Sequence, residues 1–428
     1  MASGVRTNRI EPLHGRRFSQ CRDPDVPRMG RRALRILVLS FYFRPDLSAC
    51  SFRSTALVGA IRELAPLGSH IDVITTLPNR YSSFSVDAPQ IEREGDVSIS
   101  RIALPAHQSG LVDQSKAFLS FSRGAVRTAA IHDYDIVFAT SSRLMTAVLG
   151  AWIARRHDAK LYLDIRDIFV DTIQDVLPRR VSWLTKPVFS MLEKWAVKRA
   201  DKVNLVSPGF SQYFSRRYPR QRFSYYTNGI DEEFLANQPA TRGPSAANVH
   251  RRLTVLYAGN IGEGQGLHAI VPRLAKSMGS RFHFKIIGDG GRRHALEVAV
   301  AACGAANVEL VQPLGRTELL KEYRAADVLF LHLNDHNAFK RVLPSKIFEY
   351  AALGKPVWAG VSGYAAEFVT SEISNSAVFP PCDVNAAVRS FEELTIKDAP
   401  RRDFIAKYAR SDISREMAED ILAVAGGR

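Results

Sequence analysis

Short apolar runs alternate with helix-like segments along most of this 428-residue chain. A strand, a crossover helix and a second strand form a parallel pair, so this alternation predicts a doubly wound α/β sheet. The rhythm occurs twice, which predicts two doubly wound parallel-sheet (Rossmann-like) domains that face an interdomain cleft. In the first half we expect strands at 35–41, 71–76, 97–104 (at the sheet edge), 135–139, 160–165 and 202–206, with helices at 51–67, 116–132 and 144–156. In the second half we expect strands at 253–258, 282–287, 308–311, 328–331, 356–359 and 377–379.

The segment 237–252 is rich in Pro, Gly, Ser and Ala, which is typical of a linker. It separates an N-terminal domain (34–236) from a C-terminal domain (253–383), and we expect 384–428 to form helices that cross back to the first domain. Residues 1–33 have the composition of a basic disordered extension, and Met29 is an alternative start. Ligands of open α/β sheets bind outside the carboxyl ends of the strands, so both sheets should present those ends to the cleft.

Composition narrows the class of protein. The four cysteines are scattered without metal-ligand spacing, which fits a reducing cytoplasm. The chain contains no run of eighteen apolar residues, so the sequence predicts no membrane-spanning helix. The net charge of +15 comes from two segments, 1–35 (+6) and 179–222 (+9), and such a localised positive surface favours an anionic partner.

The segment 343–357 (LPSKIFEYAALGKPV) predicts a short helix followed by a strand. Ser345 and Lys346 stand at the helix start, where free N–H groups and the helix dipole favour a phosphate. Glu349 follows one turn later, where its carboxylate would accept hydrogen bonds from ribose hydroxyls. A surface helix with a solvated Glu is the alternative.

Two glycine-containing loops directly follow predicted strands. Backbone amides can approach a ligand closely where side chains are absent, so we expect both loops to contact a nucleotide, although ordinary tight turns remain an alternative. The candidate donor-binding residues of these loops are Gly259, Asn260, Gly262 and Gln265 in the first and Gly288 and Asp289 in the second.

Charged residues cluster after the strand 160–165. Asp164, Arg166, Asp167 and Asp171 fall within eight residues. Arg166 would hold a phosphate or pair with Asp167, and a carboxylate would orient an acceptor hydroxyl. An internal ion pair that orders the loop is the structural alternative.

The segment 343–357 resembles the signature of nucleotide-sugar glycosyltransferases of the GT-B fold, in the retaining family 4 (group 1), and is most similar to fucosaminyltransferase-like enzymes of bacterial O-antigen and capsule synthesis. Further blocks match in order at 36–45, 164–169, 257–267 and 286–290, so the resemblance spans about 35–425. It implies transfer of a hexosyl or N-acetylhexosaminyl group from a nucleotide-diphosphate sugar, with a UDP-sugar favoured, and no metal cofactor. It also places His107 near the acceptor, beside Arg166 and Asp167 as the catalytic candidates, and a plain surface histidine is the alternative for His107.

Some positions depart from the family pattern. Most relatives carry two glutamates eight residues apart, and Arg341 stands at the first of these positions. Asn260 and Gln265 stand near an Arg and a Lys that grip the diphosphate in other branches, so Lys346 is our candidate for that charge. The family's adjacent glycines are replaced by 47–51 (LSACS).

An apolar stripe at helical spacing runs through 181–200, with Pro187 expected to divide it into two helices. This pattern favours docking on an anionic membrane surface, and a core-packed helix with a solvated basic face is the alternative. The candidate docking residues are Trp183, Lys186, Phe189, Lys194, Trp195, Lys198 and Arg199.

Together these features predict a glycosyltransferase of the bacterial cytoplasm, peripherally bound to the inner membrane face. Its partners would be a nucleotide-sugar donor, a polyprenyl-linked or oligosaccharide acceptor, and the anionic membrane surface, with no nucleic acid. The alternatives are a nucleotide-sugar epimerase of the same fold, which would not need the basic stripe, and an inactive relative. A basic nucleic-acid-binding protein is the alternative from another class, but neither basic segment carries a recognition motif.

Overall fold

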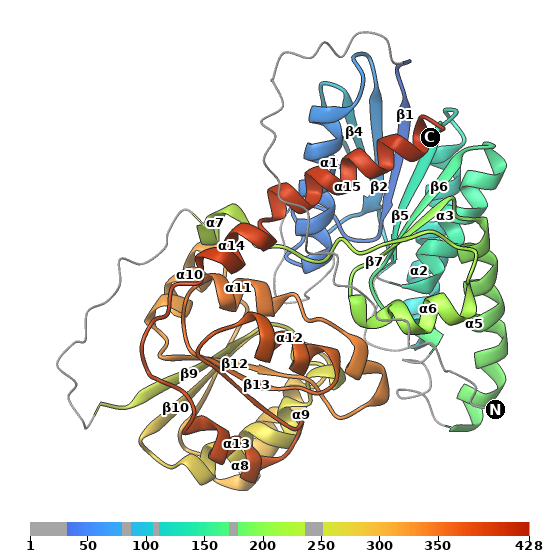
Figure 1. The fold of residues 1–428 in the computed structure, drawn as a ribbon. Coiled ribbons are helices and arrows are strands. Elements are labelled where there is room, and N and C mark those ends of the chain that lie inside the picture. The colour runs from blue at the N-terminus through green and yellow to red at the C-terminus, as the bar shows by residue number, and fades with distance from the viewer. Residues whose placement is uncertain are drawn as a thin grey trace, which may run out of the picture.

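The computed structural model describes residues 32–78, 87–105, 111–141, 143–170, 179–235 and 251–427. Within them the chain forms two α/β domains, each built on its own sheet (Figure 1). The expected fold class is therefore confirmed. The predicted extension 1–33, apart from its last two residues, and nearly all of the linker 237–252 lie outside the described residues.

The first sheet has eight strands in the order β3-β4-β2-β1-β5-β6-β7-β8. All its neighbouring pairs are parallel except β3 and β4, which are antiparallel. The prediction that 97–104 forms the edge was wrong, because β3 (IERE) covers it. The strands are β1 (Arg35–Ser40), β2 (His70–Thr76), β3 (Ile91–Glu94), β4 (Val97–Ile102), β5 (Ile136–Ser141), β6 (Lys160–Ile165), β7 (Lys202–Leu205) and β8 (Phe223–Ser224).

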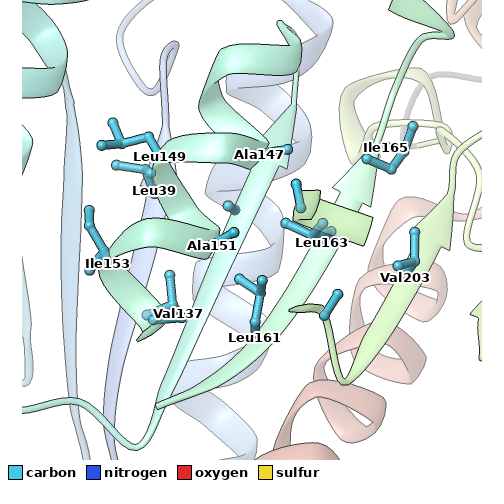
Figure 2. Packing of buried hydrophobic residues seen from close by; sticks show 14 of the residues in the cluster. Leu39, Val137, Ala147, Leu149, Ala151, Ile153, Leu161, Leu163, Ile165 and Val203 are labelled. Atoms are coloured by element: carbon cyan, nitrogen blue, oxygen red, sulfur yellow. The ribbon is translucent and has the colours of Figure 1, made fainter. Parts of the chain in front are cut away.

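Helices cover both faces of this sheet because successive strand residues point to opposite sides. Leu37 and Leu39 of β1 belong to the cluster under α2, α3 and α5, whereas Ile36 and Val38 pack under α1 and α15. Figure 2 shows α3 residues, among them Ala151, against strand residues of the first cluster. The helices are α1 (Ala49–Leu64), α2 (Leu111–Ala129), α3 (Leu144–Arg156), α5 (Arg179–Arg199), α6 (Ser211–Arg217) and α7 (Glu232–Leu235), with a 3-10 turn, η1 (Pro208–Phe210).

Helix α5 is continuous, so the prediction that Pro187 divides it into two helices was wrong. A proline removes only its own N–H from the helical ladder. Pro187 is exposed, where water can satisfy a released carbonyl and the helix can bend to fit the ring.

The second sheet has six parallel strands in the order β11-β10-β9-β12-β13-β14. Its strands are β9 (Leu253–Ala258), β10 (Phe282–Ile287), β11 (Val308–Val311), β12 (Val328–His332), β13 (Val357–Gly360) and β14 (Ser376–Phe379). The covering helices are α8 (Leu267–Met278), α9 (Arg293–Cys303), α10 (Arg316–Ala325), α11 (Lys346–Ala352), α12 (Tyr364–Glu372) and α13 (Val384–Phe391), with the 3-10 turns η2 (Glu263–Gln265) and η3 (Asn337–Arg341).

The last two helices lie on different domains. Phe404 and Tyr408 of α14 (Arg402–Tyr408) pack against Phe348 in the second domain. Helix α15 (Arg410–Ala425) lies along α1 in the first domain, as Figure 1 shows. The two segments that cross between the domains also pair with each other, because Ile230 N donates to Tyr408 O (2.8 Å) and Arg410 N donates to Ile230 O (2.9 Å).

Candidate active site

The carboxyl ends of the two sheets meet at the interdomain cleft. Ser207, just beyond β7, donates a hydrogen bond to the carbonyl of Arg341 in η3 (2.6 Å). Arg316, at the start of α10, lies over the ring of Phe52 in α1 at 4.2 Å from its centroid. Ligands of open parallel sheets bind at these strand ends, so this cleft is the candidate site.

The two glycine loops lie backbone against backbone. Gly259 N donates to Ile287 O (2.9 Å), and Ile261 N donates to Asp289 O (2.9 Å). Gly288 has φ of +146°, and a Cβ there would overlap the carbonyl of Gly259, so only glycine fits this contact. The structure thus brings both predicted loops to one wall of the cleft.

Asn260 and Gln265 bond to each other within the first loop. Asn260 Nδ2 donates to Gln265 Oε1 (2.9 Å), and the same oxygen accepts from Gly262 N (3.1 Å). In the second loop Asp289 Oδ1 accepts from Gly290 N (2.8 Å). These polar side chains therefore shape the loops.

Lys346 and Glu349 form an ion pair beside the first loop. Lys346 Nζ lies 2.9 Å from Glu349 Oε2 and donates to the hydroxyl of Tyr323 (3.0 Å), which in turn donates to Glu349 Oε2 (3.3 Å). A Cβ on Gly259 would lie 3.4 Å from Lys346 Cε, so the lysine stem lies along the loop. The alternative of a solvated Glu349 does not hold, because its side chain is only 9% exposed.

The charge of Lys346 is stabilised by its surroundings. Burial acts to lower the pKa of Lys346, but the attraction of Glu349 outweighs it and the pKa is raised. Burial and the same carboxylate raise the pKa of Tyr323 well above its usual value, so its hydroxyl keeps its proton. The cleft therefore holds a permanent cation next to backbone N–H groups.

The charged cluster after β6 divides into a buried and a cleft-facing part. Asp164 is 1% exposed and accepts two hydrogen bonds from Arg53 (3.1 Å each), with others from Thr140 (3.0 Å) and Asn204 (2.8 Å). Burial acts to raise the pKa of Asp164, but the charges of Arg53 and Arg166 outweigh it and the pKa is lowered. Asp164 is therefore a structural anion that ties α1 to the sheet.

Arg166 and Asp167 lie at the carboxyl end of β6. Arg166 Nη2 is 3.5 Å from Asn228 Oδ1, and Arg166 Nη1 is buried with no hydrogen-bond partner. Asp167 Oδ1 accepts from Ile168 N (2.9 Å). The predicted positions of His107 and Asp171 lie outside the described residues.

The chain matches two known families of protein domains. Residues 54–229 match the family described as "Glycosyl transferase 4-like domain", and residues 244–412 match "Glycosyl transferases group 1". The chain belongs to the GT-B glycosyltransferases. A 168-residue stretch is 29% identical to "Putative colanic acid biosynthesis glycosyl transferase WcaI" of Escherichia coli K12, and this match spans 39% of each chain.

Two solved structures share the fold of this glycosyltransferase. Anabaena Alr3699/HepE in complex with UDP-glucose is 16% identical with a TM-score of 0.62, over 91% of this chain and 100% of that one. WaaG, a glycosyltransferase involved in lipopolysaccharide biosynthesis, is 13% identical with a TM-score of 0.60, over 92% of this chain and 98% of that one. At these identities the likeness shows the fold alone.

Three residues that organise this site, Tyr323, Arg316 and Arg53, were not predicted from the sequence. Tyr323 holds both members of the Lys346–Glu349 pair, and nothing in its local sequence marks it. Arg316 pairs with Asp231 and Glu233 on the segment that crosses between the domains. The only sequence signal for Arg316 was its position after a predicted strand. Arg53 was detectable in principle, since it is a lone cation on the buried face of an amphipathic helix.

The candidate docking helix α5 shows both predicted kinds of contact. Trp195 packs against the core of the first domain, which fits the core-packed alternative. Lys194 and Lys198 are exposed, Lys186, Phe189 and Arg199 are half-buried, and the side chain of Trp183 lies outside the described residues. Val188 and Met191 are 51% and 64% exposed, and Trp152 on the neighbouring α3 is 40% exposed.

No helix in the described ranges is both long and apolar enough to cross a bilayer.

Proposed function

We propose that this glycosyltransferase moves a sugar from a UDP-sugar, with retention, to a lipid-linked or oligosaccharide acceptor in bacterial surface polysaccharide synthesis. The observation that carries the proposal is the Lys346–Glu349–Tyr323 cluster against the Gly259 loop. The named relatives support its direction: HepE was solved with UDP-glucose, WaaG is involved in lipopolysaccharide biosynthesis, and the name of WcaI refers to colanic acid.

The cluster suits the leaving group of such a transfer. When the bond between the anomeric carbon and the diphosphate oxygen breaks, negative charge develops on the diphosphate, and a fixed cation with N–H donors stabilises that charge. Lys346 would supply the cation, and the loops containing Gly259 and Gly288 would supply close backbone contacts. The proposal includes no metal cofactor.

Glu349 suits the ribose of the same nucleotide. A carboxylate accepts hydrogen bonds from two vicinal hydroxyls, and Tyr323 and Lys346 hold this one in a single orientation. Such preorganisation lowers the entropy cost of binding.

At the reaction centre we assign Arg166 and Asp167, with His107 as the third candidate. Arg166 follows directly after β6, and its guanidinium would pair with a phosphate oxygen of the donor. The Asp167 carboxylate would orient the acceptor hydroxyl. The hydroxyl oxygen bonds to the anomeric carbon on the face that the diphosphate leaves, and the hydroxyl proton passes to the departing diphosphate oxygen.

We place the acceptor's membrane surface at α3 and α5. Val188, Met191 and Trp152 offer exposed apolar area, and Lys194 and Lys198 offer positive charge for anionic headgroups. This face would bring the cleft near a polyprenyl-linked acceptor at the inner surface of the plasma membrane.

The test measures the binding of a panel of nucleotide sugars to the wild type and to Glu349→Gln by thermal shift and calorimetry. We expect a UDP-sugar to bind the wild type and to bind Glu349→Gln about 10- to 100-fold more weakly, because hydrogen bonds to a charged group contribute about 1.5–3 kcal/mol. Glu393→Gln, an exposed acid in the segment after α13, is the matched control and should bind normally.

Three results would contradict the proposal. Equal affinity of Glu349→Gln and wild type would remove Glu349 from the donor site. Failure of every nucleotide sugar to bind would favour an inactive relative. Conversion of the donor to an isomer without any acceptor would favour the epimerase.

A further inference from the structure

Arg316, the first residue of α10, joins the second domain to the first. Its guanidinium lies over the ring of Phe52 in α1, at 4.2 Å from the centroid, and over the ring of Phe234 at 5.1 Å. It also pairs with Asp231 and Glu233 on the segment that crosses between the domains. Two rings and two carboxylates therefore hold this guanidinium in one position, although the side chain is 21% exposed.

Asp231 extends this contact to the start of α15. Its carboxylate accepts hydrogen bonds from Arg316 and from Arg410, the first residue of α15. Arg410 Nη2 also donates to the carbonyl of Gly229 (2.8 Å). Helix α15 lies on α1 of the first domain, as Figure 1 shows, so one carboxylate connects an arginine of each domain.

Helix α10 also carries one member of the donor cluster, by which we mean Tyr323, Lys346 and Glu349. Tyr323 follows Arg316 by two turns, on the same face of the helix and about 10 Å further along its axis. The Tyr323 hydroxyl contacts both Lys346 Nζ (3.0 Å) and Glu349 Oε2 (3.3 Å). One short helix thus connects the contact with the first domain to the proposed ribose site.

The charge of Arg316 is coupled to the same cluster. Burial acts to lower the pKa of Arg316, but the attraction of Asp231 and then of Glu349 outweighs it, and the pKa is raised. Arg316 therefore stays a cation, and its field reaches the carboxylate that is proposed to bind ribose.

A second contact between the domains lies elsewhere in the described part of the cleft. Ser207 donates to Arg341 O (2.6 Å), and a Cβ on Gly209 would lie 2.5 Å from the same oxygen. Ser207 follows β7, whereas Phe52 belongs to the helix after β1, and β5 and β6 lie between these strands. Neighbouring strands are about 4.8 Å apart, so β1 and β7 are roughly 14 Å apart. Two separate contacts fix an orientation of the domains that one contact alone would leave free to rotate.

We propose that Arg316 is a positioning residue of the sugar transfer, because it keeps the donor cluster aligned with the reaction-centre candidates across the cleft. Arg166 and Asp167 belong to the first domain, and Lys346 and Glu349 belong to the second. Transfer requires both sets, whereas the proposed contacts with UDP lie in the second domain. Loss of the Arg316 contact should therefore lower the rate of transfer much more than the affinity for UDP. The kinetic part of this inference rests on the proposed function, and the structural part does not.

The kinetic test compares Arg316→Met with Arg316→Lys and Lys321→Met. The first removes the cation at nearly constant length, the second keeps it, and the third removes an exposed cation of the same helix. We measure UDP release from the UDP-sugar that the nucleotide-sugar panel identifies, and UDP binding by calorimetry. We expect kcat of Arg316→Met to fall about 10- to 100-fold, because small misplacements of reacting groups have effects of this size. Its Kd for UDP should stay within about twofold of the wild-type value.

The other variants show whether the effect belongs to this contact. Arg316→Lys should recover part of the lost rate, because it retains the cation beside Asp231. Phe52→Leu removes the ring on the first domain and should lower kcat in the same direction as Arg316→Met. Lys321→Met should match the wild type. An equal fold-loss of UDP affinity and kcat in Arg316→Met would indicate a merely structural role and overturn the proposal.

A distance measurement tests the arrangement of the domains without any substrate. Spin labels carried by unnatural amino acids replace Leu67 and Val298, two exposed residues that lie one in each domain. We expect one narrow distance distribution in the otherwise wild-type chain and in Lys321→Met, and a broader one in Arg316→Met. Identical distributions in all three would overturn the proposal. If the wild type releases UDP from no sugar, the proposed function fails, and these distributions alone decide whether Arg316 fixes the domain arrangement.

Discussion

Replacement of Gly288 by alanine tests whether the contact between the two glycine loops holds the donor wall together. The new Cβ would overlap Gly259 O and lie 3.0 Å from the Gly259 carbonyl carbon. The Cβ would lie only 1.8 Å from that oxygen, where a carbon–oxygen contact needs roughly 3 Å, so the two loops must separate by about 1 Å or more. No flexible side chain can relieve this overlap, because the opposing atoms belong to the backbone.

The cost has two parts. A non-glycine residue at φ of +146° carries about 1–3 kcal/mol of strain. Separation of the loops weakens the bonds from Gly259 N to Ile287 O (2.9 Å) and from Gly288 N to Val311 O (3.0 Å), each with a net contribution of about 1 kcal/mol. We expect Gly288→Ala to lose about 3 kcal/mol of unfolding free energy and to bind UDP more weakly.

Urea unfolding and UDP titration of Gly288→Ala would be compared with Gly291→Ala. Gly291 lies three residues away, and no atom lies within 4 Å of its Cβ position, so alanine there should change stability by less than about 0.5 kcal/mol. If the two variants unfold at the same urea concentration and bind UDP equally, the reasoning from loop contact is refuted.

Two further predictions concern pH and the membrane. The ring of His332 bridges Gln265 O (2.7 Å) and Cys382 N (3.0 Å), and burial lowers its pKa from 6.5 to about 4, so its neutral form stabilises the fold above pH 6.5. As the pH falls from 6.5 to 4, this histidine takes up a proton in the unfolded state before it does so in the folded state. In urea titrations the wild type should therefore lose up to about 3 kcal/mol more unfolding free energy than His332→Asn. Equal losses of unfolding free energy in the two proteins would refute this prediction. Met191→Glu should sediment several-fold less with phosphatidylglycerol vesicles than the wild type, because it places an anion on the exposed face of α5. Val298→Glu, an equally drastic change on the second domain, should sediment normally, and equal sedimentation of both variants would exclude α5 as the docking face.

Local patterns located most elements of the fold. The helix expected at 144–156 and the strand at 160–165 occur with those bounds, because each is a continuous apolar run with clear ends. The strand β3 was missed because three of its four residues are charged, and it exists through pairing with β4. Pairing with a neighbour leaves no trace in such a short polar segment.

The sequence predicted the separate segments of the candidate site, but it did not predict the contacts between residues that are far apart in the chain. The glycine loops and the Lys346–Glu349 helix were identified because strand ends and helix starts have local signals. The ion pair between Asp164 and the buried Arg53 could not be predicted, since these residues are 111 positions apart. Their contact depends on how α1 packs on the sheet.

The amino-acid order by itself determined two parallel α/β domains, because strand and helix periodicities are local properties of hydrophobic patterning. It also placed the donor-binding candidates at strand ends. Only the tertiary structure decided which charges are satisfied: Tyr323 reaches Glu349, and both Arg316 and Arg410 reach Asp231. Hydrogen bonds and ion pairs act over a few ångströms, so they are set by packing between segments far apart in the chain.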